Sequence, residues 1–487
     1  MKLTELFENV PDIEVKCLTA DSRKKRPDSI FFCVKGMKYD GHNFVDEAIS
    51  NGAKVVVHSE PIPNMKDDVT YIRVRDVMTA YNKVADAFYH YPSHKLLMVG
   101  VTGSYGKSSV ACIIRDILNE FQPTGYIGTM DIEYGSVKLP PVPASPDIDD
   151  LHGILRDMVD TGMKSSIVEV SSIGIEQNRY DSIDFDVAVF TNLSSDHLDY
   201  HLTVANYIQA KKRLFDGLKP EAVAVVNADD PVSRQMVQDC RCKVITYGID
   251  QEADYRAVSY QLLKDRSRMT LSISGMEYEL ETNLIAKFNI YNLLAAIAAL
   301  HVKGIPIEQM KPFINDLRQI DGRMERIIDG QPFNILVDLA NSPDGIEQVC
   351  QYASAITPKG KRIIALTGSS GKKDVVRRPL IGKVLDKYCD MIILTEDDPA
   401  SEDPADIARE IAAGIRSTNC ITIEDRENAI RQAIELADIN DTVLLLGKGN
   451  SRTIFRNFGP EEYEGDDVLV HNILKKYYFT DGDEEVL

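Results

Sequence analysis

Short apolar runs, each followed by a stretch with helical spacing, recur along most of the chain. Near the N-terminus, residues 29–35 (SIFFCVK) and 54–58 (KVVVH) are predicted to be buried strands, with a helix from Phe44 to Ser50 between them. Further strands are predicted at 96–101, 186–190, 334–339, 362–367, 391–395 and 442–446. Strands that alternate with helices form parallel sheets covered by helices, so the predicted fold class is α/β with mainly parallel sheets.

The chain has 487 residues, which is more than one compact domain normally holds. The segment 89–94 (YHYPSH) contains a proline and few apolar residues, as domain boundaries often do. The unit that opens with the strand at Leu96 is predicted to end near 321–326 (DGRMER). We therefore predict three domains, which cover 1–94, 95–327 and 328–487.

Charge and composition exclude several classes of function. The formal charge of −20 argues against a general affinity for nucleic acid or anionic membranes, because both depend on dense Lys and Arg. No apolar run reaches the roughly 20 residues that a membrane span needs, and the N-terminus lacks the pattern of a signal peptide. The eight cysteines include no CxxC pair, which favours reduced thiols over a disulfide or zinc framework. We expect a cytoplasmic protein.

Residues 99–109 (VGVTGSYGKSS) have the spacing of a phosphate-binding loop between a strand and a helix. Gly103 and Gly106 would let backbone N–H groups turn toward a phosphate, and the N-terminus of the helix adds a partial positive charge. Lys107 would neutralise the β- and γ-phosphates, and Ser108 would place a hydroxyl on Mg²⁺. The alternative is a plain tight turn, but the flanking strand and helix favour nucleotide binding.

Two residues at strand ends are candidates for metal coordination. Glu169 ends the apolar strand in SSIVEVSS, where an acid is costly unless it is exposed or paired with a cation. The alternative for Glu169 is a solvent-facing residue on an edge strand. His197 follows the strand at 186–190 in a polar loop, where ligands are common, although a single histidine is more often structural.

Lys211 lies within the apolar face of a predicted helix that also carries Tyr207, Ala210, Leu214 and Phe215. In one interpretation its aliphatic stem covers apolar surface while the amine reaches water. In the other, the amine is carboxylated by CO₂ and becomes an anionic oxygen donor, which suits Mg²⁺. Spacing alone does not separate the two.

The motifs, taken in order, resemble one family, the Mur ligases of peptidoglycan synthesis, and most closely the MurE type. Lys211 in YIQAKKRLF stands where the family has its carboxylated lysine, Glu169 matches its Mg²⁺ glutamate and His197 matches its metal histidine. The resemblance also rests on DSR (21–23), TGYIGT (124–129), ASPD (144–147), FNIYN (288–292), GRMER (322–326), RRPL (377–380), DDPASEDP (397–404) and GKG (447–449). It implies a three-domain architecture with a central P-loop-type parallel sheet and a C-terminal Rossmann-like α/β domain.

The resemblance also implies a role for particular residues. It assigns ATP binding to Gly103, Ser104, Gly106, Lys107, Ser108, Ser109, Asn289, Asn292, Arg323 and Asp338. It assigns the UDP-linked substrate to Ser22, Ala144, Ser145, Ser171, Gln177 and Arg179, and the incoming amino acid to Asp397, Asp398, Ala400 and Gly447. The implied metal ligands are Ser108, Glu169, His197 and carboxylated Lys211, and the implied catalytic residues are Lys107, Glu169, His197 and Lys211.

The implied reaction is ATP-dependent and forms ADP. The γ-phosphate would move to the D-glutamate carboxylate of UDP-N-acetylmuramoyl-L-alanyl-D-glutamate, and the amino acid would attack the resulting acyl-phosphate. Since both groups are anionic in the first step, catalysis should depend on charge neutralisation and alignment. We expect ATP, Mg²⁺ and these small molecules as the only partners, and a monomer.

The family's diaminopimelate-adding members have DNPR where this chain has Asp397-Asp398-Pro399-Ala400. Their arginine forms a fork that suits the far carboxylate of that substrate, and alanine has no such donor. Because the neighbouring acids should repel a carboxylate, we predict L-lysine as the added residue, with L-ornithine and meso-diaminopimelate as competing candidates. Ile173, Leu339, Asn341, Asn450 and Ser451 also depart from the family pattern. These departures keep two further interpretations open, a related ligase for another carboxylate and a nucleotide-binding pseudoenzyme.

Overall fold

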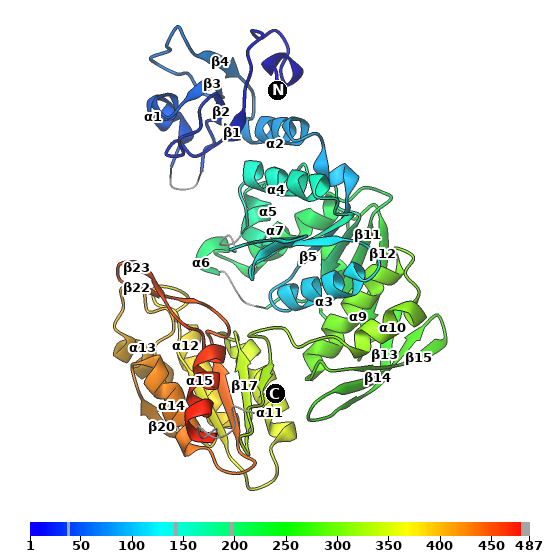
Figure 1. The fold of residues 1–487 in the computed structure, drawn as a ribbon, viewed down its shortest axis with the longest axis vertical. Coiled ribbons are helices and arrows are strands. Elements are labelled where there is room, and N and C mark those ends of the chain that lie inside the picture. The colour runs from blue at the N-terminus through cyan, green and yellow to red at the C-terminus, as the bar shows by residue number, and fades with distance from the viewer. Residues whose placement is uncertain (37–38, 141–144, 195–197, 479–487) are drawn as a thin grey trace, which may run out of the picture. The chain divides into compact units, whose positions relative to one another are not determined.

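The computed structural model describes residues 1–36, 39–140, 145–194 and 198–478. Helices and strands alternate along most of the chain (Figure 1). The chain divides into two compact units. The first comprises 1–103, 114–191 and 205–246, and the second comprises 104–113, 192–204 and 247–487. Among the described residues, no helix has both the length and the apolar character that crossing a membrane requires.

The first sheet lies near the N-terminus and has four parallel strands in the order β1-β2-β3-β4. The strands are β1 (Cys17–Thr19), β2 (Ser29–Phe32), β3 (Ala53–His58) and β4 (Thr70–Arg73). Helix α2 (Val77–Phe88) packs on one face against Ile30, Phe32 and Val55. Helix α1 (Val45–Ser50) packs against Phe31 and Val56, which point the other way. Both faces are covered, so β2 and β3 are apolar runs without a polar face.

The second sheet has eleven strands in the order β15-β14-β13-β12-β11-β10-β5-β9-β6-β7-β8. Its central strands β11 (Val223–Asn227), β10 (Val187–Phe190), β5 (Leu97–Thr102), β9 (Ser165–Glu169) and β6 (Thr124–Ile127) run parallel. Antiparallel strands extend it on both sides, namely β7 (Ile132–Tyr134) and β8 (Val137–Leu139), and β13 (Tyr255–Leu262), β14 (Ser267–Ile273) and β15 (Met276–Thr282). The remaining strand is β12 (Lys243–Gly248).

Helices connect strands of this sheet, and two more follow its last strand. The connecting helices are α3 (Lys107–Asn119), α4 (Ile148–Asp160), α5 (Ser172–Glu176), α6 (Leu198–His201), α7 (Val204–Asp216) and α8 (Ser233–Met236), and the two that follow β15 are α9 (Lys287–His301) and α10 (Ile307–Asn315). The stretch from Leu293 to Leu300 in α9 is entirely buried. This explains why α9 is apolar on all sides instead of along one stripe.

The third sheet has six strands in the order β16-β17-β21-β18-β19-β20. Strand β16 (Glu325–Ile327) runs antiparallel to β17 (Asn334–Asp338), and the others, β21 (Thr442–Leu446), β18 (Ile363–Thr367), β19 (Met391–Leu394) and β20 (Asn419–Thr422), run parallel. One face is covered by α11 (Pro343–Ile356), α12 (Arg377–Tyr388) and α13 (Pro404–Ala412), and the other by α14 (Arg426–Leu436) and α15 (Asp466–Tyr478). A separate hairpin consists of β22 (Thr453–Arg456) and β23 (Gly459–Glu462).

The α/β class and the parallel sheets predicted from the sequence are confirmed. Each strand predicted from an apolar run is present within a few residues of its expected position, as β2, β3, β5, β10, β17, β18, β19 and β21. The helix predicted from Phe44 to Ser50 is α1, and the helix predicted around Lys211 is α7. The antiparallel strands β13 to β15 were not predicted.

Candidate active site

The phosphate loop occupies residues 103–106, between the end of β5 and the first residue of α3. Gly106 has φ of +80°, a conformation that favours glycine. A Cβ atom at Gly106 would also lie 2.6 Å from Oδ1 of Asn292, so a larger residue is excluded by contact as well. The Nζ of Lys107 donates to the carbonyl of Ser104 at 2.9 Å, which folds the lysine back over the loop.

Two asparagines predicted to bind ATP lie together on α9. The Nδ2 of Asn292 donates to Oδ1 of Asn289 at 2.8 Å, and the Nδ2 of Asn289 donates to the carbonyl of Ile285 at 2.7 Å. Both side chains are buried. Because Asn292 also contacts the loop at Gly106, helix α9 brings residues that are distant in sequence to the same loop.

Glu169 is the last residue of β9, and it pairs with Val101 of β5. Its Oε1 accepts hydrogen bonds from the hydroxyl of Tyr126 and from the backbone N–H of Thr129, the latter at 3.1 Å. The carboxylate is therefore held at the carboxyl end of the parallel strands, where ligands of such sheets bind. The segment 124–129 is one of the motifs on which the family resemblance rests, and its described contacts include these to Glu169.

Lys211 lies beside the start of the phosphate loop. Its Nζ donates to the carbonyl of Gly103 at 2.8 Å and lies 3.5 Å from Oγ1 of Thr102. The side chain is only 1% exposed and lies over the ring of Tyr207, 4.6 Å from its centroid. The interpretation in which the amine of Lys211 reaches water is therefore wrong. Carboxylation of Lys211 stays a prediction, and His197 lies outside the described residues.

Arg323 and Asp338 lie close together in the second unit. An Nη of Arg323 is 3.4 Å from Oγ of Ser108, the second residue of α3. The carboxylate of Asp338 accepts the backbone N–H groups of Met324 and Ala340, each at 2.7 Å. Burial raises the pKa of Asp338, and the charge of Arg323 opposes that shift. Asp338 thus fixes the backbone next to Arg323, and its contact with nucleotide stays a prediction.

Four residues predicted to bind the UDP-linked substrate gather around α5. The hydroxyl of Ser145 lies 2.8 Å from that of Ser171 and also contacts the hydroxyl of Tyr180. Arg179 donates to the carbonyl of Ser145 and to Oε1 of Gln177. Ser22 does not join them in the described contacts, since its hydroxyl bonds to Glu47. Ala144 lies outside the described residues.

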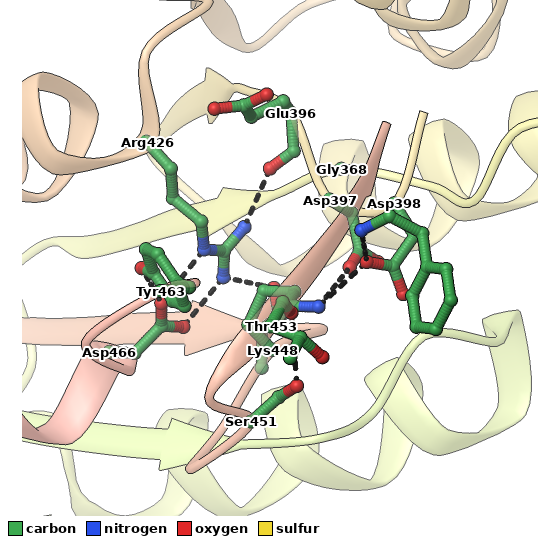
Figure 2. Close-up of polar contacts among 12 residues, drawn as sticks. Gly368, Glu396, Asp397, Asp398, Arg426, Lys448, Ser451, Thr453, Tyr463 and Asp466 are labelled. Carbon is green, nitrogen blue, oxygen red and sulfur yellow. Dashed lines mark hydrogen bonds and ion pairs between the residues drawn. The ribbon is translucent and has the colours of Figure 1, made fainter. Parts of the chain in front are cut away.

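The predicted amino-acid site lies in two loops of the third sheet (Figure 2). The Nζ of Lys448 is 2.8 Å from Oδ1 of Asp398 and 3.9 Å from Oδ1 of Asp397. Gly447 has φ of +107°, and a Cβ there would meet Oδ2 of Asp397 at 3.0 Å. Burial raises the pKa of Asp397, whereas the charge of Lys448 lowers it. Lys448 therefore joins the loops after β19 and β21.

The acids of this segment are compensated by bases from elsewhere in the chain. Arg456 binds both carboxylate oxygens of Glu396, at 2.6 and 3.0 Å. Arg378 binds Glu402 at 2.8 Å, and Asp403 accepts from the backbone at the start of α13. These bases are shared with further acids, because Arg456 also binds Glu461 and Arg378 also binds Glu410. The predicted repulsion of a carboxylate therefore stays a prediction.

Comparison with known proteins gives matches over most of the chain. Residues 14–89 match the catalytic domain of the Mur ligase family, 101–300 the Mur ligase middle domain, and 322–449 the Mur ligase glutamate ligase domain. A UDP-N-acetylmuramoyl-L-alanyl-D-glutamate–2,6-diaminopimelate ligase from Halalkalibacterium halodurans is 35% identical over 469 residues, which cover 96% of this chain and 95% of that protein. The chain belongs to the Mur ligase family.

Two further comparisons indicate the MurE type. A Geobacillus kaustophilus ligase of the same name is 36% identical over 488 residues, which cover 96% of this chain and 98% of that one. A solved structure of such a ligase superposes with a TM-score of 0.70 at 27% identity, over 99% of this chain and 100% of the other. This Mur ligase is thus an ATP-dependent enzyme that forms amide bonds, and it has the three-domain architecture of its family.

Mur ligases use Mg²⁺ with ATP, and the residues of this chain fit such an ion. Mg²⁺ prefers oxygen ligands and is commonly held by one or two carboxylates together with substrate phosphates. Glu169 offers a carboxylate, and Ser108, which belongs to the other compact unit, offers a hydroxyl; that they hold the ion stays a prediction. Within the described parts of the chain, no three His, Cys, Asp or Glu side chains cluster as a metal site. When bound, the ion would neutralise phosphate charge.

Several side chains that contact the predicted site residues were missed from the sequence. Tyr126 and Thr129 bind Glu169, and Tyr180 binds Ser145. Lys448 and Arg456 compensate the acidic segment from positions about 50 to 60 residues further along the chain. The motif GKG pointed to Lys448, but no sequence signal indicated Arg456.

Proposed function

We propose that this Mur ligase adds the third residue of the stem peptide to UDP-N-acetylmuramoyl-L-alanyl-D-glutamate, a step of peptidoglycan synthesis. The main support is the phosphate loop, where Gly106 packs on Asn292 and Lys211 reaches Gly103. The names of the two curated relatives give the same substrate. ATP and a UDP-linked sugar are cytoplasmic metabolites, so we place the enzyme in the cytoplasm, as a monomer.

The proposed chemistry activates a carboxylate, because its oxygen is a poor leaving group. The terminal carboxylate of D-glutamate attacks the γ-phosphorus of ATP, which gives an acyl-phosphate and ADP. The amine of the incoming residue then attacks the acyl carbon, and phosphate leaves while the nitrogen loses a proton. Lys107 and the N-terminus of α3 neutralise the phosphates, and Arg323 adds positive charge beside Ser108.

We propose L-lysine as the added residue, for a reason that differs from simple repulsion by the acidic segment. Ala400 offers no donor to a second carboxylate. The bases that contact the segment are already engaged, Arg456 by Glu396 and Glu461, and Lys448 by Asp398. A far carboxylate would have to displace one of these ion pairs, whereas the ammonium of lysine would not.

Meso-diaminopimelate is the second candidate, and two observations favour it. The curated relatives described above carry that amino acid in their names. In addition, the bases beside the acidic segment reduce the repulsion that a carboxylate would meet.

A competition assay with L-lysine, L-ornithine and meso-diaminopimelate distinguishes the candidates. We expect the purified enzyme to incorporate L-lysine first, and Ala400→Arg to shift the preference toward meso-diaminopimelate. Ser401→Arg, which adds the same charge one residue further along, is the matched control and should not shift it. A wild-type preference for meso-diaminopimelate would refute the lysine proposal. Release of no ADP with any of the three would count against the proposed reaction itself.

A further inference from the structure

Arg426 and Asp466 form an ion pair that is almost completely buried, at 1% and 0% exposure (Figure 2). The Nε of Arg426 donates to one carboxylate oxygen of Asp466 at 2.8 Å, and an Nη donates to the other at 2.6 Å. Arg426 is the first residue of α14 and Asp466 is the first residue of α15. Such a pair is costly to desolvate, and replacing it with apolar residues is often neutral for stability. Its presence therefore suggests a purpose other than stability.

The remaining hydrogen bonds of this pair go to loop backbone. Arg426 donates to the carbonyl of Glu396 at 3.1 Å and to the carbonyl of Leu446 at 2.9 Å. The backbone N–H of Asp466 donates to the carbonyl of Gly449 at 3.1 Å. Glu396 directly precedes Asp397, whereas Leu446 and Gly449 enclose Gly447 and Lys448. The pair thus holds both loops that are assigned to the amino acid.

Strand pairing does not join these two loops directly. They follow β19 and β21, and β18 lies between those strands in the sheet. Gly368, just after β18, leaves space for the loop after β19, since a Cβ there would lie 2.4 Å from the carbonyl of Thr395. Lys448 joins the loops through its side chain, and Arg426 joins them through their backbone.

We propose that Arg426 and Asp466 are positioning residues that set the distance between the loops 396–400 and 447–449, and thereby the affinity for the incoming amino acid. This inference rests on the proposed function of these loops. Neither side chain would touch the substrate, because both are buried beneath the loops. Loss of the pair should weaken binding of the amino acid without affecting ATP or the UDP-linked substrate.

The test compares Arg426→Lys and the double variant Arg426→Met/Asp466→Leu with the wild-type enzyme. Lysine keeps the charge but cannot hold two carbonyls and a carboxylate with a planar fork. The double variant removes both charges, which protects the fold if the single change destabilises it. The matched control is Arg362→Met. Arg362 binds Asp441 at 2.8 Å, and these residues directly precede β18 and β21, whereas the two loops follow the ends of β19 and β21.

In Arg426→Lys and in the double variant we expect the KM for the amino acid to rise about tenfold or more, because small displacements of binding groups are costly. The KM values for ATP and the UDP-linked substrate should stay within about twofold, as expected for independent sites. Arg362→Met should lower the melting temperature and leave all three KM values unchanged. If Arg426→Lys or the double variant folds and its KM for the amino acid is unchanged, the inference is overturned.

A second measurement is independent of the proposed function. The backbone N–H of Ala400 donates to the carbonyl of Phe455, and that of Gly447 donates to the carbonyl of Asp338. Hydrogen exchange at these two amides should be faster in Arg426→Lys than in the wild type, and unchanged in Arg362→Met. Unchanged exchange in Arg426→Lys would overturn the positioning role even if the enzyme proved to use another substrate.

Discussion

At the scale of single residues, Lys107 is the side chain of the phosphate loop that we expect to matter most for chemistry. It folds over the loop and bonds to the carbonyl of Ser104, so its charge lies at the loop that we propose holds a phosphate. This hydrogen bond is local and is not part of a hydrophobic core. Removal of the side chain should therefore affect chemistry far more than folding.

We predict that Lys107→Ala abolishes ADP formation, with a loss of about a hundredfold or more, as for other groups that stabilise transition-state charge. A coupled ADP assay and a thermal melt on the same sample give the two readouts. Lys95→Ala is the control, because Lys95 is exposed just before β5. Full turnover by a folded Lys107→Ala enzyme would mean that the phosphate loop is assigned wrongly.

We also predict that Lys211 is carboxylated, by attack of the neutral amine on CO₂ with loss of a proton. The product keeps one N–H, so the bond to the carbonyl of Gly103 can persist. With ¹³C-bicarbonate, the enzyme should show a carbamate resonance that disappears in Lys211→Ala and remains in Lys212→Ala. Lys212 is the matched control because it is paired with Asp216 and Asp239.

Lys211→Ala should also lose activity, and a small added carboxylic acid should restore part of it by supplying the missing oxygens. A crystal structure with bound Mg²⁺ and an unmodified ammonium at Lys211 would contradict the prediction.

Residue-level prediction succeeded where the contacts are local and failed where they are distant. The loop from Gly103 to Lys107 was predictable, because strand, glycines, lysine and helix follow one another in sequence. The charge around Glu396 was not, because Arg456 compensates it from sixty residues away. Counting the acids of one segment gives the local charge only when no distant base packs against it.

At the scale of elements, apolar runs identified the buried parallel strands but not the antiparallel extension. Strands β13, β14 and β15 have exposed residues among the buried ones, as in Arg268 beside Met269. Only one side of such a strand needs to be apolar, so its sequence differs little from a polar loop with scattered apolar residues. Their pairing became clear only from the register of neighbouring strands.

Helix α4 carries a prediction about pH. His152 is completely buried, with Nε2 2.8 Å from the hydroxyl of Ser182, and burial lowers its pKa to about 4. The unfolded chain therefore binds a proton at this histidine at higher pH than the folded protein does. Stability should fall as pH decreases from about 6.5 to about 4, by up to about 3 kcal/mol.

Urea unfolding across this range measures the effect, and His152→Gln should flatten the slope. Burial raises the pKa of the neighbouring Asp86, which contributes with the opposite sign at the acidic end. An equal slope in the wild type and the variant would show that another group causes the pH dependence.

At the scale of the whole molecule, we propose domains at 1–94, 95–327 and 328–487, with one sheet in each of the first two. The third sheet contains β16, whose residues 325–327 precede the proposed boundary. Apolar content could not reveal this, because β16 has only three residues, and one of them is Arg326. Its assignment to the third sheet follows from its pairing with β17.

The position of β16 determines how a C-terminal fragment would behave on its own. Without residues 325–327, β17 becomes an edge strand with unpaired backbone groups, and its five residues are all buried ones. Identical chains can add strands to such an edge. We therefore predict that residues 328–487 self-associate, whereas 318–487, which retains β16 and Met324 on Asp338, stays monomeric. Light scattering during gel filtration distinguishes the two, and equally monodisperse fragments would refute the prediction. If the prediction holds, strand β16 prevents aggregation through the edge of β17, in addition to joining two domains.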